Sequence, residues 1–154
     1  MSRSDRWLVA DMYADKTLKP KINDFLYEQE SYKIRGACFE VWKQFKGMFK
    51  ESIIDNALTI ALQAKGLAVE SQKRINIYFQ DKKVGTYIPD KIINGIILIE
   101  LKSKALVTKH DLETFWNYLK GSEYKLGFFI NFSPTKLEIK RVVYDTAREK
   151  THQR

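Results

Sequence analysis

Two apolar segments on either side of Asn94-Gly95 constrain the fold of this chain more than any other feature. Such an arrangement is typical of a β-hairpin. Asp90 lies on the first arm, and Glu100 and Lys102 lie on the second. Because side chains alternate along a strand, Glu100 and Lys102 share one face and Leu101 points to the other. Two acids and a lysine among isoleucines are costly to bury, so they favour a metal-binding hydrolytic site over a plain core strand.

The length of the hairpin loop decides whether the two acids can cooperate. A two-residue loop would place Glu100 on the face opposite to Asp90. A three-residue loop, residues 93–95, would pair Asp90 with Leu98 and make the acids diagonal neighbours, roughly 7–8 Å apart. A bulge near Pro89 would have the same effect. We predict one of these last two solutions.

Two carboxylates at this separation repel each other unless a cation lies between them. Oxygen ligands suit Mg²⁺ or Mn²⁺, and the main-chain carbonyl of Leu101 is a candidate third ligand beside Asp90 and Glu100. The nearby acids favour the charged form of Lys102, which could then position the attacking water as an electrostatic stabiliser. Each of these residues alone could be a turn residue or a solvated strand residue. Their combination among isoleucines favours the site.

Glu51 is a fourth candidate, as a catalytic acid and a further metal ligand. Helical spacing places it on the face of Ile54, Leu58 and Leu62, from which a carboxylate could reach the sheet. The alternative is a glutamate in the first turn of a helix, favoured by the helix dipole by less than about 1 kcal/mol. Periodicity leaves both interpretations open.

The chain is basic, with a formal net charge of +8 and a pI of about 9.5, which favours a polyanionic partner such as nucleic acid. Two groups of polar and basic residues are candidates for phosphate contacts, although solvated surface is the alternative for both. They are Lys104, Lys109, His110, Asn117 and Tyr118, and Lys43, Lys46 and Lys50.

Hydrophobic periodicity predicts one α/β domain over residues 31–145, between an N-terminal extension (1–30) and a polar tail (146–154). Helices are expected over about 31–47, 49–65 and 108–120, the last opened by a Thr108–Asp111 capping box. Strands at 84–93 and 96–102 are apolar on both faces and should be central. The expected order is ααβββαββ, a mixed central sheet flanked by helices.

Cys38 is the only cysteine, which excludes an intramolecular disulfide and a zinc site built from several cysteines. A cytoplasmic location is therefore expected. No apolar run is long enough to span a membrane, so we expect no membrane association. The oligomeric state, a homodimer among the options, is left open by the sequence.

Several segments resemble one known family in the same order along the chain. Residues 32–41 resemble the opening of the GxxExxY proteins, a branch of the PD-(D/E)XK nuclease superfamily. The segments 87–90, 99–102, 117–120 and 125–132 are similar to its later blocks. This resemblance implies the restriction-endonuclease-like fold and metal-dependent phosphodiester cleavage.

The same resemblance implies roles for individual residues. Asp90 and Glu100 would be metal ligands, Lys102 the catalytic lysine and Glu51 the helix acid.

The chain departs from the family pattern at three positions. Met48 stands where the family has glycine, Ile54 where it has tyrosine, and Thr114 where a glutamine is common. The acids and the lysine are retained, so the departures bear on substrate positioning more than on metal binding.

We therefore expect a Mg²⁺-dependent nuclease that acts on nucleic acid, with DNA as the expected substrate. One alternative is a catalytically inactive nuclease-fold protein that binds nucleic acid or serves as an adaptor. Another is a protein-interaction domain whose charge is incidental.

Overall fold

The computed structural model describes residues 26–144 of the 154. The predicted polar tail and residues 1–25 of the predicted extension lie outside the described residues. Within residues 26–144, the first helix begins at Glu28, three residues before the predicted start of the domain.

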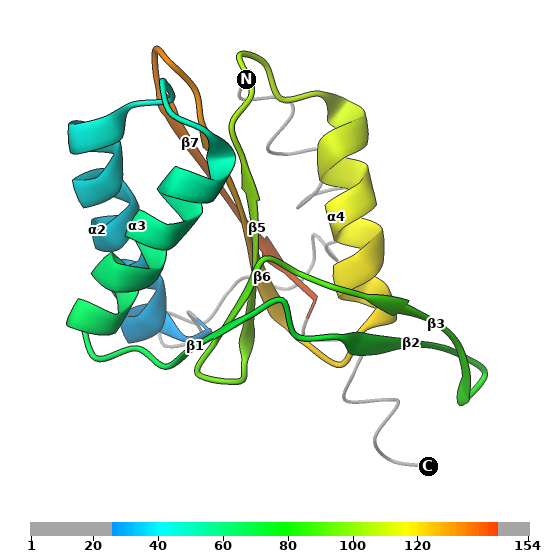
Figure 1. Cartoon of the computed structure of the whole chain (residues 1–154). Coiled ribbons are helices and arrows are strands. Elements are labelled where there is room, and N and C mark those ends of the chain that lie inside the picture. Colours follow the sequence, from blue (N-terminus) through cyan, green and yellow to red (C-terminus); the bar gives the residue numbers. More distant parts are fainter. Residues whose placement is uncertain (1–25, 145–154) are drawn as a thin grey trace, which may run out of the picture.

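Helices α2 (Glu28–Phe45) and α3 (Glu51–Ala64) form an antiparallel pair on one face of the central sheet (Figure 1). Their buried residues recur at helical spacing, as Ile34, Cys38 and Val41 do on α2. With the sheet they enclose the larger of two hydrophobic cores. Both helices lie where periodicity predicts them.

The central sheet has five strands in the order β1-β4-β5-β6-β7. Only β5 and β6 pair in parallel, and helix α4 (Lys109–Gly121) connects them across the opposite face of the sheet (Figure 1). This arrangement confirms the predicted fold class, a mixed sheet flanked by helices. The strands are β1 (Val69–Ser71), β4 (Lys91–Ile93), β5 (Ile97–Lys102), β6 (Leu126–Phe132) and β7 (Leu137–Val143).

Helix α4 begins with the predicted capping box. The Thr108 hydroxyl accepts a hydrogen bond from the backbone N of Asp111 at 3.1 Å, and the Asp111 carboxylate accepts one from the backbone N of Thr108 at 2.9 Å. The apolar face of α4 packs on the sheet to form the second core. In residues 26–144, no helix is long and apolar enough to cross a membrane.

The single strand predicted over residues 84–93 is wrong. It is divided by Pro89, which lacks the N–H donor of a sheet ladder. The first part belongs to β3 (Lys82–Tyr87), which pairs with β2 (Ile75–Phe79) in a separate two-stranded ribbon. Only β4 joins the central sheet. The order follows the predicted ααβββαββ in outline, but five short strands precede α4 where that order has three.

The β4–β5 hairpin turns at Asn94 and Gly95, which both have positive φ. The backbone N of Ile96 donates to the carbonyl of Ile93 at 2.9 Å, so the turn is of type I′. The ladder, however, pairs Ile93 with Ile97. Ile96 is therefore an extra residue that follows the turn on the β5 side.

This extra residue brings the two acids to one face. When the β4–β5 register is continued by one residue, Asp90 lies directly opposite Glu100. The predicted shared face is thus observed, and the connection between the paired residues has the three residues of one proposed solution, but it spans 94–96 and not 93–95. Leu98 pairs with Ile92, not with Asp90, and the additional residue is Ile96 instead of a bulge near Pro89.

Gly47 lets the α2–α3 connection approach the turn between β6 and β7. A Cβ at this position would lie 2.2 Å from the carbonyl O of Phe132 and 2.4 Å from the carbonyl C of Ser133, both backbone atoms. Nearby, Trp42 Nε1 donates to the carbonyl of Ser133 at 3.2 Å. The connection therefore has a fixed position, and α3 begins four residues after Gly47.

Gly47→Ala should destabilise the protein by about 1–3 kcal/mol, because overpacking forces a backbone shift. Gly85→Ala is the matched control, since a Cβ at Gly85 meets nothing within 4 Å. Urea denaturation would show a lower midpoint for Gly47→Ala alone. Equal midpoints for the two variants would contradict the close packing at Gly47.

Candidate active site

Asp90 lies where β4 stops covering the edge of β5. The strand β4 pairs with β5 only as far as Ile99. Beyond it, the backbone N of Leu101 donates to Asp90 Oδ2 at 2.7 Å. The Asp90 carbonyl accepts from the backbone N of Gln72 at 3.3 Å. These two hydrogen bonds fix Asp90 at the open edge of the central strand.

Glu100 projects toward the α4 side of β5 and lies beside Asp90. Burial is the main cause that raises the pKa of Glu100, to about 8, followed by its hydrogen bond with Asp90 and the negative charge of Asp90. The hydroxyl of Tyr87 donates to Glu100 Oε2, and this bond and the Lys102 charge act in the opposite direction. Without a cation, burial and the neighbouring Asp90 therefore disfavour the ionised form of Glu100.

Lys102 and Glu51 complete the group. The Glu51 residue is exposed, but partial burial of its carboxyl raises its pKa, and the negative charge of Asp90 raises it further. Lys102 and the backbone N–H of Ser103 act in the opposite direction. Glu51 is thus close enough to both Asp90 and Lys102 to feel their charges, although it is the first residue of a different element.

The oxygen atoms at this site fit a hard divalent cation. Residues 26–144 hold no group of three or more His, Cys, Asp and Glu side chains placed to bind a metal. Mg²⁺, however, is usually bound through one or two carboxylates and keeps several waters. The carboxylates of Asp90 and Glu100, with the carbonyl of Leu101 between Glu100 and Lys102, meet that requirement.

A pocket of about 180 Å³ opens on the α4 side of the acids. It brings Glu100 and Lys102 together with two of the predicted contact residues, His110 and Tyr118, and with Thr114, the departure from the family pattern on α4. Its lining is Glu100, Lys102, His110, Asp111, Thr114, Phe115, Tyr118 and Phe129.

Other predicted contact residues on this side are engaged in the structure. Lys104 Nζ pairs with Asp111 Oδ1 at 2.7 Å, and the Lys104 backbone N and O bond the buried amide of Asn131 at 2.9 Å each. Lys109 Nζ lies 3.5 Å from Glu113 Oε1 in an exposed i,i+4 pair. Asn117 is exposed on α4.

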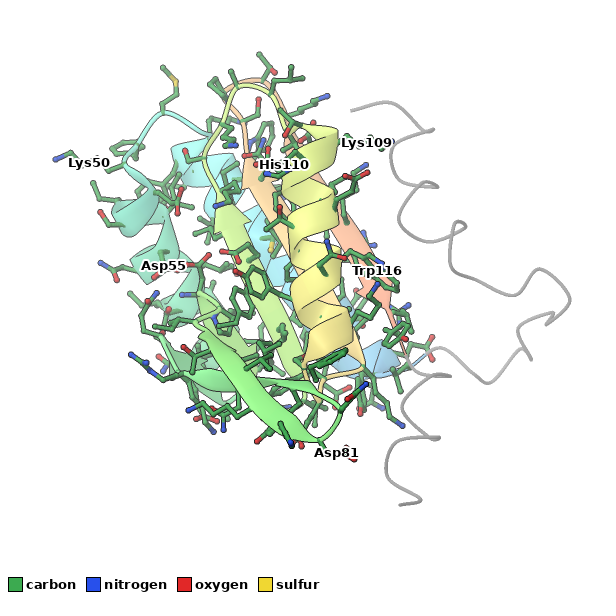
Figure 2. All side chains as sticks on the ribbon, turned by 90° about the vertical axis from the view of Figure 1, so that its right-hand side faces the viewer. Lys50, Asp55, Asp81, Lys109, His110 and Trp116 are labelled. Atoms are coloured by element: carbon green, nitrogen blue, oxygen red, sulfur yellow. The ribbon has the colours of Figure 1, made fainter. Side chains whose placement is uncertain are left out.

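Lys43, Lys46 and Lys50 gather where α2 ends and α3 begins, and we call them the α2–α3 corner. Lys46 Nζ lies 3.9 Å from the centre of the Trp42 ring, whereas Lys43 and Lys50 are exposed. In Figure 2, Lys50 at the start of α3 and Lys109 and His110 at the start of α4 lie on opposite sides of β5. The predicted contact residues therefore flank the acids from both sides.

Sequence analysis missed Tyr87, which is buried at the end of β3. Its ring stacks on Tyr118 with centroids 4.1 Å apart and planes 10° from parallel. Burial raises the pKa of the Tyr87 hydroxyl, and the charge of Glu100 raises it further, so Tyr87 stays a hydrogen-bond donor. No local signal in the sequence marks it.

Lys91 and Asp55 were missed as well. Lys91 is completely buried, and its Nζ lies 2.6 Å from Asp55 Oδ1 on α3. A signal was available, because Lys91 has the strand parity of Ile93 and therefore occupies a core-facing position.

The raised pKa of Glu100 predicts how the metal-free protein responds to pH. The folded state keeps a proton on Glu100 that the unfolded chain loses near pH 4.5. This contribution to stability is full below about pH 4.5 and is lost as the pH rises to about 8. With EDTA present, the Tm of wild type should fall across that range relative to Glu100→Gln.

Glu123→Gln, at an exposed position outside the site, is the control and should keep the wild-type profile. If the profiles of Tm against pH ran parallel for wild type and Glu100→Gln, the pKa of Glu100 would not be raised in the folded protein.

A protein-family model of the PD-(D/E)XK nuclease superfamily matches residues 28–142. The match includes the acid pair, Lys102 and the helix that carries Glu51. Comparisons with curated proteins and with solved structures gave no match. Because the family match covers most of the chain, this protein belongs to the PD-(D/E)XK nuclease superfamily.

Proposed function

We propose that this protein is a metal-dependent nuclease that hydrolyses phosphodiester bonds of nucleic acid, with DNA as the expected substrate. The observation that carries the proposal is the Asp90–Glu100 carboxyl pair, with Lys102 on the same face of β5 as Glu100. Two neighbouring carboxyl groups, of which Glu100 ionises reluctantly on its own, suit Mg²⁺ or Mn²⁺ and a phosphate substrate when a lysine lies next to them.

Asp90, Glu100 and the Leu101 carbonyl would hold the metal, with Glu51 as a further candidate. When bound, such a cation acidifies a coordinated water and offsets the charge of the phosphate. The bond from Leu101 N orients the Asp90 carboxylate, and the Tyr87 hydroxyl orients that of Glu100. The chain thus fixes both acids before any ligand binds.

Lys102 would position the attacking water and stabilise the negative charge that develops on the phosphate oxygens. Glu51 would accept a hydrogen bond from that water from the α3 side. The proximity of Glu51 to Asp90 and Lys102 in the folded chain supports both roles.

The substrate would lie between α3 and α4, over the open edge of β5. His110, Asn117 and Tyr118 would contact it from α4, together with Lys109, and the α2–α3 corner would contact phosphates from the other side. Lys104, held by Asp111, would act mainly by fixing the loop before α4.

We also assign the chain to the GxxExxY branch, because residues 32–41 and the four later segments resemble its blocks in the same order. Met48 is 78% exposed, and Ile54 is fully buried in the core, so these two departures lie outside the acid pair. Thr114 lines the pocket, so this departure would affect how the substrate is positioned. A cytoplasmic location and a homodimer stay predictions.

The pocket position of Thr114 favours one alternative, a nuclease-fold protein that binds nucleic acid without cutting it. A threonine offers a shorter polar group than the glutamine of the family pattern, so the substrate could bind without reaching the acids in a productive orientation. Cleavage and binding assays separate the two functions.

Cleavage of single- and double-stranded DNA and RNA should depend on Mg²⁺ or Mn²⁺ and stop in EDTA. Glu100→Ala and Lys102→Ala should each lower the rate by about 10²-fold or more, because each removes a group that acts on the transition state. Lys33→Ala, at an exposed position on α2, is the matched control and should cut like wild type.

Metal-dependent cutting by wild type and the control alone would support the nuclease and identify its substrate. Equal cutting by Glu100→Ala would reveal a contaminant. Binding with no cutting would favour the alternative function.

Binding to nucleic acid should weaken steeply with salt, and removing two exposed lysines of the α2–α3 corner should reduce that dependence. For double-stranded DNA, each lost phosphate contact lowers the slope of log K against log salt by about 0.9. The variant Lys43→Gln/Lys50→Gln would be compared with Lys33→Gln/Lys82→Gln, which removes the same charge elsewhere. Equal slopes for the two variants would exclude the corner as a phosphate contact.

A further inference from the structure

Lys91 carries a buried positive charge next to the proposed active site. Its side chain is completely inaccessible to solvent, and its Nζ contacts Asp55 Oδ1 at 2.6 Å. On β4 it faces the same core as Ile93, opposite Ile99 of β5. Because it is buried, Lys91 cannot touch a substrate.

An ion pair such as this one, with Lys91 buried and Asp55 partly buried, adds little to folding stability. Removing two charges from water costs much of what their attraction returns, and apolar replacements are often as stable. An isoleucine at Lys91 would match its neighbours in the core. The main effect of the pair is therefore on the arrangement of the elements that it joins, and not on the free energy of folding.

The pair lies one residue from Asp90 along β4 and one helical turn from Glu51 along α3. Asp55 and Glu51 are i,i+4 neighbours and project from the same side of the helix. Figure 2 shows Asp55 on α3, on the side that faces β5. The ion pair thus joins the strand segment next to Asp90 to the helix that carries Glu51.

Besides the close packing at Gly47 and the bond from the Ser103 N–H to Glu51, few contacts hold the first turn of α3. Lys50 at its N-cap makes no side-chain capping hydrogen bond. Glu51, Ser52 and Ile53 are exposed, so the first buried residue of the helix is Ile54.

We propose that the Lys91–Asp55 ion pair positions the start of α3 against the β4–β5 edge and so places Glu51 beside Asp90. Lys91 and Asp55 are positioning residues in this proposal. The consequence for catalysis rests on the proposed nuclease function, whereas the consequence for the helix does not.

Three variants separate positioning from stability. Asp55→Asn leaves the Lys91 charge buried and unpaired, so it should lower Tm the most. Lys91→Met leaves Asp55 able to reach solvent and should lower Tm less. Lys91→Met/Asp55→Asn removes both charges and should recover much of the Tm lost in Asp55→Asn.

The double variant Lys91→Met/Asp55→Asn should fold, but its Glu51 should be displaced from the site. Its cleavage rate should fall by about 10²-fold, the cost of a displacement of about 1 Å in an active site. Adding Glu51→Gln should then cost little more, because Glu51 no longer acts. Multiplicative losses in the combined variant, or wild-type activity of the double variant, would overturn the positioning of Glu51.

The exposed pair Lys65–Glu40, 2.8 Å apart at the other end of α3, supplies the control. Lys65→Met/Glu40→Gln removes an ion pair from the same helix and should keep the wild-type cleavage rate. A loss equal to that of Lys91→Met/Asp55→Asn would show a general effect on α3.

Amide hydrogen exchange tests the helix without any nuclease activity. The amides of Ile53 and Ile54 bond the Lys50 carbonyl at 3.0 and 3.2 Å, and their exchange should accelerate in Lys91→Met/Asp55→Asn. The Leu62 amide should change less. Unchanged exchange at Ile53 and Ile54 would overturn the proposal, even if wild type proves unable to cut nucleic acid. An inactive wild type with accelerated exchange would instead reject the nuclease function alone.

Discussion

The hydrogen bond from the backbone N of Leu101 to Asp90 Oδ2 is the contact on which the site depends. The strand β4 is three residues long, so it leaves the edge of β5 without a partner strand beyond Ile99. A backbone N–H that is shielded from water needs an acceptor, and the Asp90 carboxylate provides one. The same bond brings that carboxylate to Glu100. A longer β4 would satisfy Leu101 with a backbone carbonyl and would leave Asp90 with no reason to lie at this edge.

The charges around this contact do not balance. Among residues 26–144, the recorded partners of Glu51, Asp55, Asp90 and Glu100 include the cations Lys91 and Lys102, which leaves an excess of two negative charges in this group when every member is ionised. Burial, and after it the hydrogen bond with Asp90 and the Asp90 charge, raise the pKa of Glu100, which keeps one proton in the site. A divalent cation would supply the missing charge and release that proton. Metal affinity and the protonation of Glu100 are therefore linked, as they are wherever ligands must be deprotonated to bind.

Sequence patterns predicted the parts of this structure that local physics decides. Helical periodicity located α2 and α3, and the spacing of Thr108 and Asp111 located the start of α4. The shared face of Asp90 and Glu100 was also expected, but the position of the three-residue connection was not. Tertiary contacts decide whether Ile96 pairs with β4 or is an extra residue after the turn. Ile96 packs on the core, and the Asn94 side chain accepts a hydrogen bond from the backbone N of Ala68 at 2.8 Å. Such contacts join residues far apart in the chain, and the Lys91–Asp55 pair was missed for the same reason.

Tyr87 shows how elements outside the central sheet bear on the acids. It ends β3, its ring stacks on Tyr118 of α4, and its hydroxyl donates to Glu100. A two-stranded ribbon is marginal on its own, so the position of Tyr87 requires the ribbon to pack elsewhere. Ile77 of β2 supplies such a contact, because a Cβ at Gly121 would lie only 3.2 Å from its Cγ2. The orientation of Glu100 is therefore set by both the ribbon and α4, and α4 also lines the pocket that a substrate would enter. A substrate that displaced α4 would shift Tyr87 through its stacking on Tyr118, and would thereby change the orientation of Glu100.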